Sequence, residues 1–135
     1  MTTKRTLSKR ERLKSSVIME QLFSSGNSIK SGPFVLLWRI QKLSSSVPIQ
    51  VGFSVPKKKF KKAVTRNKIR RLIKEAYRLQ KTGLFDTVIK SEKQLALFIL
   101  YRDNNESTQK ELQDKIIVAL SRLENELKIE LSNAD

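Results

Sequence analysis

Residues 56–81 read PKKKFKKAVTRNKIRRLIKEAYRLQK, and this stretch holds 12 of the chain's 28 lysine and arginine residues against one acid, Glu75. Its apolar residues follow the i, i+3, i+4, i+7, i+8 spacing of one helix face: Ile69, Leu72, Ile73, Ala76 and Tyr77. At about 100° per residue, a polar and basic group gathers on the opposite side: Asn67, Arg70, Arg71, Lys74, Arg78 and Lys81. The stretch therefore predicts a helix that docks on a core and exposes a strip of cations. Such a strip is self-repelling unless a polyanion binds it, and nucleic acid is the obvious polyanion.

The composition limits the chemistry that the chain can perform. It has 135 residues, enough for one domain with its own core. Cysteine and histidine are both absent, which excludes disulfide frameworks, zinc ribbons and thiol nucleophiles and removes the commonest general base. A net charge of +15 and a pI near 10.3 are typical of a nucleic-acid binder. The lack of cysteine suits a reducing compartment and the longest apolar run, 95–101, is too short to span a bilayer, so we predict a cytoplasmic protein.

The charge is unevenly distributed and suggests the domain boundaries. Residues 1–14 are basic with no apolar core after them, which predicts a flexible N-terminal arm rather than a signal peptide. Residues 15–131 are predicted to form a single RNA-binding domain, and residues 132–135 a disordered tail. Residues 103–135 carry eight acids against four bases, so the positive charge lies mainly in the first two thirds of the chain.

Hydrophobic patterning predicts an α+β fold with the element order αβββαβα. Ser15 or Ser16 can cap a first helix that ends near Ser25, with Gly26 as its stop. A short strand near 28–31 is weakly indicated, and residues 34–40 and 49–55 read as long strands joined by a polar hairpin loop at 43–48. Thr82, Gly83 and Asp86 are expected to end the basic helix, which leaves residues 84–94 as loop with at most a helical turn. The apolar run 95–101 predicts a strand buried on both faces, and Thr108 to Glu111 form a capping box that opens a long last helix.

Two neighbouring motifs resemble a known family. Residues 51–58, VGFSVPKK, and residues 63–75, AVTRNKIRRLIKE, are similar to the strand and the Arg-Asn-Arg helix of the protein subunit of bacterial ribonuclease P. The resemblance extends over about residues 6–131 in element order. It departs from the family pattern at Lys68, which replaces the third signature arginine and loses its planar fork. Met19 and Leu37 stand where many members have an aromatic residue.

The resemblance implies a two-layer sandwich of three helices on one mixed four-stranded sheet with three long strands and one short. It also implies that a large RNA subunit with bound Mg²⁺ cuts precursor tRNA, while the protein docks on that RNA and holds the 5′ leader. No cofactor or metal is expected on the protein alone, and neither a catalytic residue, a small-molecule substrate nor a membrane partner is predicted. The residues expected to bind the RNA subunit are Lys57, Lys58, Arg66, Asn67, Lys68, Arg70, Arg71, Lys74 and Arg78. Those expected to form the leader-binding cleft are Met19, Phe23, Val35, Leu37, Ser54, Arg66 and Arg102.

Each of these assignments has a structural alternative. An extended RNA strand stacks its bases on apolar or aromatic side chains, but the apolar surplus around Met19 and Phe23 could equally be core. In the functional reading, Ile18 and Leu22 fill the core. Trp38 follows Leu37 on its strand, so it is expected to point to the other face and pack against a helix. Arg102 could reach leader phosphates or be an ordinary surface arginine.

Two other functions are compatible with parts of this pattern. A ribosomal or ribosome-assembly protein would share the basic strip but would need no leader cleft. A protein-only nuclease is disfavoured, because the chain lacks histidine and clustered carboxylates for two-metal chemistry.

Overall fold

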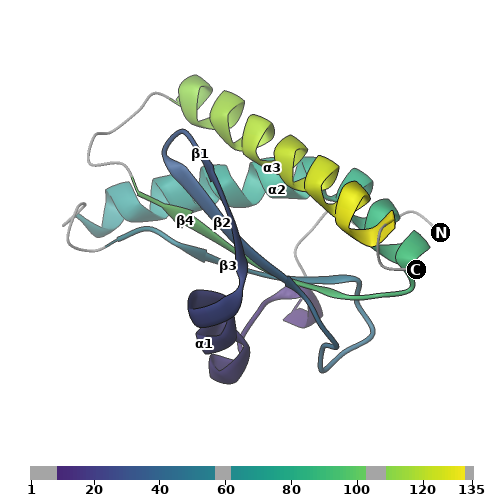
Figure 1. The fold of residues 1–135 in the computed structure, drawn as a ribbon. Coiled ribbons are helices and arrows are strands. Elements are labelled where there is room, and N and C mark those ends of the chain that lie inside the picture. Colours follow the sequence, from purple (N-terminus) through teal and green to yellow (C-terminus); the bar gives the residue numbers. More distant parts are fainter. Residues whose placement is uncertain (1–8, 57–61, 103–108, 133–135) are drawn as a thin grey trace.

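The structure is a computed structural model, and it describes residues 9–56, 62–102 and 109–132 (Figure 1). The predicted order of three helices and four strands is confirmed, with one additional short 3-10 helix at the start. The elements are η1 (Lys9–Glu11), α1 (Ser16–Ser25), β1 (Asn27–Ser31), β2 (Phe34–Ile40), β3 (Ile49–Ser54), α2 (Ala63–Ser91), β4 (Leu95–Tyr101) and α3 (Gln109–Ser132). Across these residues, none of the helices combines the length and the apolar character needed to cross a bilayer. The capping box at Thr108 and the tail beyond residue 132 lie outside the described residues.

The four strands form one mixed sheet in the order β1-β2-β4-β3. β4 pairs antiparallel with β2 and parallel with β3, so it separates the two strands that we predicted to form a hairpin. The hairpin prediction is therefore wrong. β4 takes the centre because nearly all of its side chains are apolar and a central strand is buried on both faces. The segment after β2 instead folds onto Gln94, whose side chain binds the backbone of Leu43, Ser45 and Val47.

The helices α2 and α3 lie side by side on one face of the sheet, as Figure 1 shows. Alternate residues of the central strands point into the core beneath them: Phe34, Leu36, Trp38, Leu95, Leu97, Ile99 and Tyr101. Trp38 is 4% exposed and belongs to this cluster together with apolar side chains of α3. Its predicted orientation toward the helix layer is thus confirmed.

The helix α1 crosses part of the opposite face of the sheet (Figure 1). Ser15 caps it, since its hydroxyl accepts a hydrogen bond from the Ile18 N–H at 3.3 Å. It ends at Gly26, whose N–H donates to the Leu22 carbonyl. Leu22 is buried in a second, smaller cluster with Leu13, Leu43, Ala96 and Phe98. Ile18, predicted to be core, is only partly buried at the edge of this cluster.

The helix α2 is longer than its sequence suggested. It begins at Ala63 and continues to Ser91, so the predicted break at Thr82 and Gly83 is wrong. The continuation is stabilised because Leu84 and Val88 extend the apolar face beyond Tyr77 and are buried against the core. One glycine costs a helix only about 1 kcal/mol, which this burial offsets.

Residues 9–14, which we assigned to the flexible arm, belong to the folded domain. Glu11 and Leu13 are buried, and Arg12 forms a parallel β-bridge with Val51 on β3. The Leu13 N–H donates to the Val51 carbonyl at 3.0 Å. The segment therefore covers the outer edge of β3, and only residues 1–8 of the predicted arm lie outside the described residues.

Candidate nucleic-acid interface

The basic strip consists of five residues of α2: Asn67, Arg70, Arg71 and Lys74, which are exposed, and Arg78, which is partly exposed. The predicted apolar face of the same helix is buried, as expected from the 3.6-residue period. A shallow hollow of about 480 Å³ runs along the strip and is lined by its five members together with Arg12 and Glu75. In the described part of the chain, Arg70, Arg71 and Lys74 have no ion-pair partner. Their charge is therefore available to an external anion.

Glu75 is the acid that interrupts the strip. It pairs with Arg78, whose Nε donates to the carboxylate at 3.1 Å while the guanidinium makes a second, shorter contact. This hydrogen bonding holds the pKa of Glu75 below its ordinary value and raises that of Arg78. Arg78 is thus partly neutralised, and the strongest cationic part of the strip lies nearer the N-terminus of α2.

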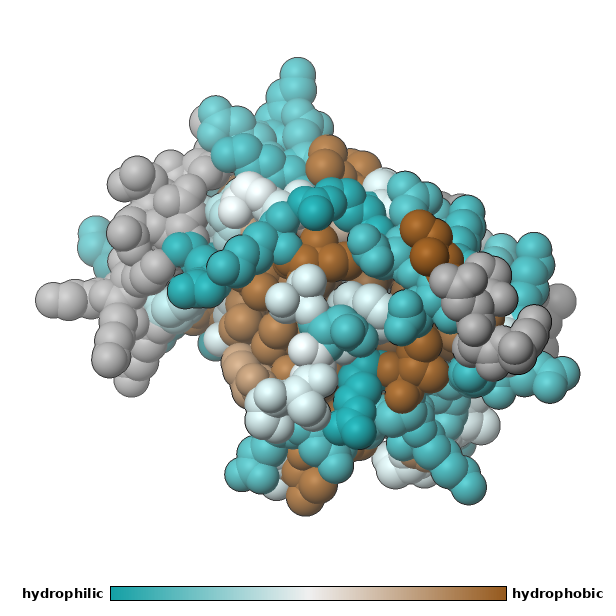
Figure 2. Space-filling view, viewed as in Figure 1, coloured by the Kyte–Doolittle hydropathy of each residue, from teal (hydrophilic) through white to brown (hydrophobic). Residues whose placement is uncertain are grey.

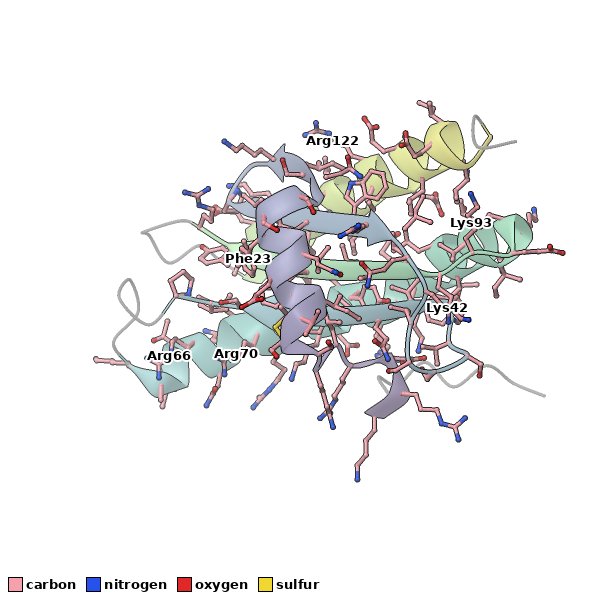
Figure 3. All side chains as sticks on the ribbon, turned by 60° about the horizontal axis from the view of Figure 1, so that its bottom comes forward. Phe23, Lys42, Arg66, Arg70, Lys93 and Arg122 are labelled. Carbon is pink, nitrogen blue, oxygen red and sulfur yellow. The ribbon has the colours of Figure 1, made fainter. Side chains whose placement is uncertain are left out.

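The remaining predicted RNA-subunit contacts lie at the start of α2 or before it. Asn67 and Lys68 are exposed in the first turns, and Arg66 is partly exposed. Lys57 and Lys58 lie outside the described residues. In Figure 3, Arg66 and Arg70 both project from the N-terminal half of α2, at the end of the molecule away from Lys42 and Lys93. The signature residues therefore lead directly into the strip.

The register of the sheet brings three predicted cleft residues onto one face. These are Val35, Leu37 and Ser54. Val35 and Ser54 both pair with Leu100, so the side chains of Val35, Leu100 and Ser54 form a row across β2, β4 and β3. Leu37 and Gly52 pair with Phe98 in the next row. A Cβ atom on Gly52 would come within 2.7 Å of the Phe98 ring, so the glycine lets this ring lie over β3. We call this surface the α1 face, because α1 crosses it.

The exposure of the cleft candidates differs strongly. Val35 is 8% exposed and Met19 and Leu37 are partly buried, so these three contribute mainly to packing beneath α1. Phe23 is 58% exposed, and its ring meets Phe98 edge to face with the centroids 5.4 Å apart. Phe23 therefore offers an open aromatic surface held in place from below. Figure 2 shows hydrophobic surface between the helix layer and α1, bordered by hydrophilic side chains.

Two predicted arginines lie toward the same end of the sheet. Arg102 follows β4 directly and is exposed, and its backbone N–H donates to the Pro33 carbonyl at 2.7 Å. It comes two residues after Leu100, and α2, which carries Arg66, begins nine residues after the adjacent β3 ends at Ser54. The row formed by Val35, Leu100 and Ser54 is therefore the row of the α1 face nearest Arg102.

Sequence reasoning missed two cations and misplaced a third. Arg12 and Lys14 approach the strip from the N-terminal segment, where they line a hollow with Arg70 and Lys74. Lys81, which we expected on the strip, is 1% exposed. The signal for Lys81 was present, since it lies four residues after Tyr77 and three before Leu84 on the apolar face. It was overlooked because the helix was expected to end at Thr82. Among the described residues, no group of three acidic side chains could hold a metal ion.

Known proteins match this sequence and this fold. The family model described as Ribonuclease P matches residues 7–124. The ribonuclease P protein component of Chlorobaculum tepidum is 39% identical over 92 residues, which cover 62% of this chain and 59% of the relative. The corresponding protein of Porphyromonas gingivalis is 35% identical over 82 residues, covering 61% and 60%. The matched regions thus span about three fifths of the relatives' length.

Solved structures share the fold at lower sequence identity. The RNase P protein of Staphylococcus aureus aligns with a TM-score of 0.68 at 22% identity, covering 85% of this chain and 96% of that one. The RNase P protein of Thermotoga maritima aligns with a TM-score of 0.64 at 24% identity, covering 84% and 97%. The family model matches most of this chain, so the chain belongs to the family of bacterial ribonuclease P proteins.

Proposed function

We propose that this protein is the protein component of a ribonuclease P ribonucleoprotein, and that its basic strip binds the catalytic RNA subunit. The observation that carries the proposal is the run of unpaired cations Arg70, Arg71 and Lys74 on one exposed helix face, beside the signature residues Arg66 to Lys68. Each cation that meets a phosphate releases condensed counterions, and arginine adds planar hydrogen bonds. Lys57 and Lys58, which precede this helix, are proposed to extend the same contact.

The α1 face is proposed to hold the 5′ leader of precursor tRNA. Phe23 supplies an exposed ring on which a base can stack without sequence reading. Met19, Val35, Leu37 and Ser54 shape the surface around it, and Arg66 and Arg102 lie toward the end of the sheet where leader phosphates could pass. This placement would let the protein distinguish precursor from mature tRNA, because only the precursor has a leader.

The chemistry of leader removal is assigned to the RNA subunit. Mg²⁺ held by that RNA would supply the charge stabilisation for hydrolysis, and no residue of this chain is given a catalytic role. The protein's part is to bind and orient two polyanions that otherwise repel each other. Its positive charge replaces some of the cation screening that the RNAs need, which matters most when Mg²⁺ is scarce. A cytoplasmic location fits this role.

A cleavage assay tests the proposal with precursor tRNA in three mixtures: the protein alone, a bacterial ribonuclease P RNA alone, and both together. At low Mg²⁺ we expect cleavage in the complete mixture, little with the RNA alone and none with the protein alone. Cleavage by the RNA-free protein would show that the protein itself performs the chemistry, and it would contradict the proposal. Equal cleavage rates for the RNA subunit with and without the protein would show that the protein does not contribute to the enzyme.

A ribosomal or ribosome-assembly protein remains the alternative from another class. It would use the basic strip in the same way, but it would leave Phe23 without a ligand. The complete mixture separates the two, since an assembly protein would bind RNA without restoring cleavage at low Mg²⁺.

A further inference from the structure

A buried ion pair anchors the N-terminal segment to α2. Lys81 Nζ lies 3.3 Å from both carboxylate oxygens of Glu11, and the two residues are 1% and 9% exposed. The lysine also lies 5.5 Å from the centroid of the Phe85 ring. Removing either partner would leave an uncompensated charge in the core, so the pair fixes where this segment meets the helix.

Backbone and side-chain contacts hold the rest of the segment in place. The Arg10 carbonyl accepts a hydrogen bond from the Gln50 side chain at 3.0 Å, and Arg12 forms a β-bridge with Val51. Leu13 is 6% exposed in the cluster beneath α1. Arg12 and Lys14, by contrast, are exposed, so their charged ends are free to face the solvent beside α2.

Lys81 lies at the border between the buried face of α2 and the basic strip. Lys81 follows Arg70 by 11 residues, which is three turns and returns to nearly the same direction. Lys74 lies about 10 Å from Lys81 along the helix axis. The three residues from Glu11 to Lys14 also span about 10 Å when extended. Anchoring Glu11 at Lys81 thus lets Arg12 and Lys14 run back along the helix toward Lys74 and Arg70.

These four cations surround a hollow of about 270 Å³. Its floor is formed by Val51, Gly52 and Phe53 of β3, and Leu13 completes its lining. Within the described residues no acidic side chain lines it, and none of the four cations has an ion-pair partner. The hollow is continuous with the basic strip, because Arg12, Arg70 and Lys74 line both.

We propose that Arg12 and Lys14 complete, with Arg70 and Lys74, a pocket for a phosphodiester group of the ribonuclease P RNA subunit, and that the Lys81–Glu11 ion pair positions this segment. The inference rests on the proposed function, since it extends the RNA-subunit contact of α2 to a second segment of the chain. The RNA subunit is the source of the phosphodiester because the pocket shares two cations with the strip assigned to that RNA.

The pocket is tested by measuring the affinity of the full chain for a bacterial ribonuclease P RNA over a range of salt concentrations. Arg12→Ala should weaken binding roughly fivefold near 0.15 M salt. It should also lower the salt slope, which is the magnitude of the slope of log affinity against log salt concentration, by about 0.7–0.9, as expected for one lost phosphate contact. Lys93→Ala is the matched control, because it removes the same charge from an exposed residue at the other end of the molecule (Figure 3). It should leave both quantities nearly unchanged.

The positioning role of the ion pair is tested with Glu11→Gln. This change should lower the salt slope although Glu11 itself repels phosphate, because the segment that carries Arg12 is released. Its effect should not add to that of Arg12→Ala in the double variant. Thermal unfolding of each variant shows that the protein used for binding is folded, and a folded Glu11→Gln protein with an unchanged slope would overturn the positioning role.

The remaining outcomes separate this pocket from the proposed function. If Arg70→Ala and Lys74→Ala weaken binding while Arg12→Ala and Lys14→Ala behave like Lys93→Ala, the pocket is overturned and the strip stands. If none of the α2 variants weakens binding, the proposed function fails as well. If Arg12→Ala changes only the preference of the assembled enzyme for precursor over mature tRNA, the phosphodiester belongs to the leader and the assignment to the RNA subunit is overturned.

Discussion

Tyr77 is fully buried on α2, and its hydroxyl has no hydrogen-bond partner in the described part of the chain. Its ring packs against Phe53 with the centroids 6.0 Å apart, beside the Lys81–Glu11 pair. Burial, and then the negative charge of Glu11, raise the pKa of Tyr77 well above its ordinary value of 10.0. The residue thus contributes packing, while its hydroxyl contributes a desolvation cost.

We therefore expect Tyr77→Phe to leave the fold unchanged and to stabilise it at neutral pH by up to roughly 1–3 kcal/mol. Above pH 10 the unfolded chain ionises this tyrosine and the folded chain does not. The contribution of the neutral Tyr77 hydroxyl to the free energy of unfolding is fully present below pH 10. It is lost as pH rises toward the raised folded pKa, by up to about 1.4 kcal/mol per pH unit. Denaturant unfolding of both proteins between pH 8 and about 11 should show a gap that widens in favour of Tyr77→Phe. Parallel curves would contradict this account of Tyr77.

Single-residue inferences from the sequence succeeded where one periodicity decided the outcome. The alternation of β2 placed Trp38 opposite Leu37, and the helix period of α2 separated Ile69 from Arg70. The same reasoning failed for Lys81, because a lysine on an apolar face requires a partner from elsewhere in the chain. That partner, Glu11, is 70 residues away in the sequence, and a local sequence pattern cannot predict such a pairing.

At the scale of elements, Gly83 shows how tertiary packing overrides a local signal. A Cβ atom at this position would come within 2.2 Å of Glu124 Oε1 on α3, yet that atom ends a flexible, half-buried side chain that can rotate. The helix continues through the glycine because Leu84 and Val88 are buried beyond it. The helical spacing of the apolar residues therefore predicts the extent of α2 better than the helix-breaking residues do.

Gly83→Ala should accordingly stabilise the protein, by up to about 1 kcal/mol, because alanine has the higher helix propensity and Glu124 can move aside. Gly26→Ala is the contrasting variant, since its Cβ would come within 2.6 Å of the backbone carbonyl of Leu22, which cannot rotate away. It should destabilise the fold. Chemical denaturation measures both, and a clear loss of stability in Gly83→Ala would show that Glu124 is fixed.

The strand order could not be inferred from element order alone. β2 and β3 follow each other in the sequence and are joined by residues 41–48, which favoured a hairpin, but the more apolar β4 is inserted between them. The α1 face depends on this insertion, because Leu100 brings Val35 and Ser54 into one row. Sequence reasoning thus grouped these residues through the family resemblance, whereas the physical reason for their proximity is the register of a strand far along the chain.

At the scale of the whole molecule, the basic strip of α2 and the helix α3 lie on different sides (Figure 3). The basic strip lies on one side, and Figure 3 shows Arg122 of α3 on the other. On α3, Arg122 binds the Lys30 carbonyl and shares a polar hollow with Glu126 and Glu130. In Figure 3, Phe23 lies on the α1 face, between Arg122 and the basic strip. A polyanion is therefore attracted to the side that bears the basic strip.

The central claim is that this protein gives the assembled enzyme its preference for a leader. The direct measurement is the ratio of precursor to mature tRNA affinity of the assembled enzyme, with the native protein and with Phe23→Ala. Val17→Ala is the matched control, because Val17 is equally exposed on α1, and Leu22→Ala reports on a buried neighbour.

A lost stacking contact is worth about 1–3 kcal/mol, so Phe23→Ala should reduce the ratio by roughly 5- to 150-fold. Val17→Ala should leave the ratio unchanged, and Leu22→Ala should lower stability through a cavity without altering the ratio of the folded enzyme. A native-like ratio for Phe23→Ala, in an enzyme that still cleaves precursor tRNA, would contradict the claim that the α1 face holds the leader.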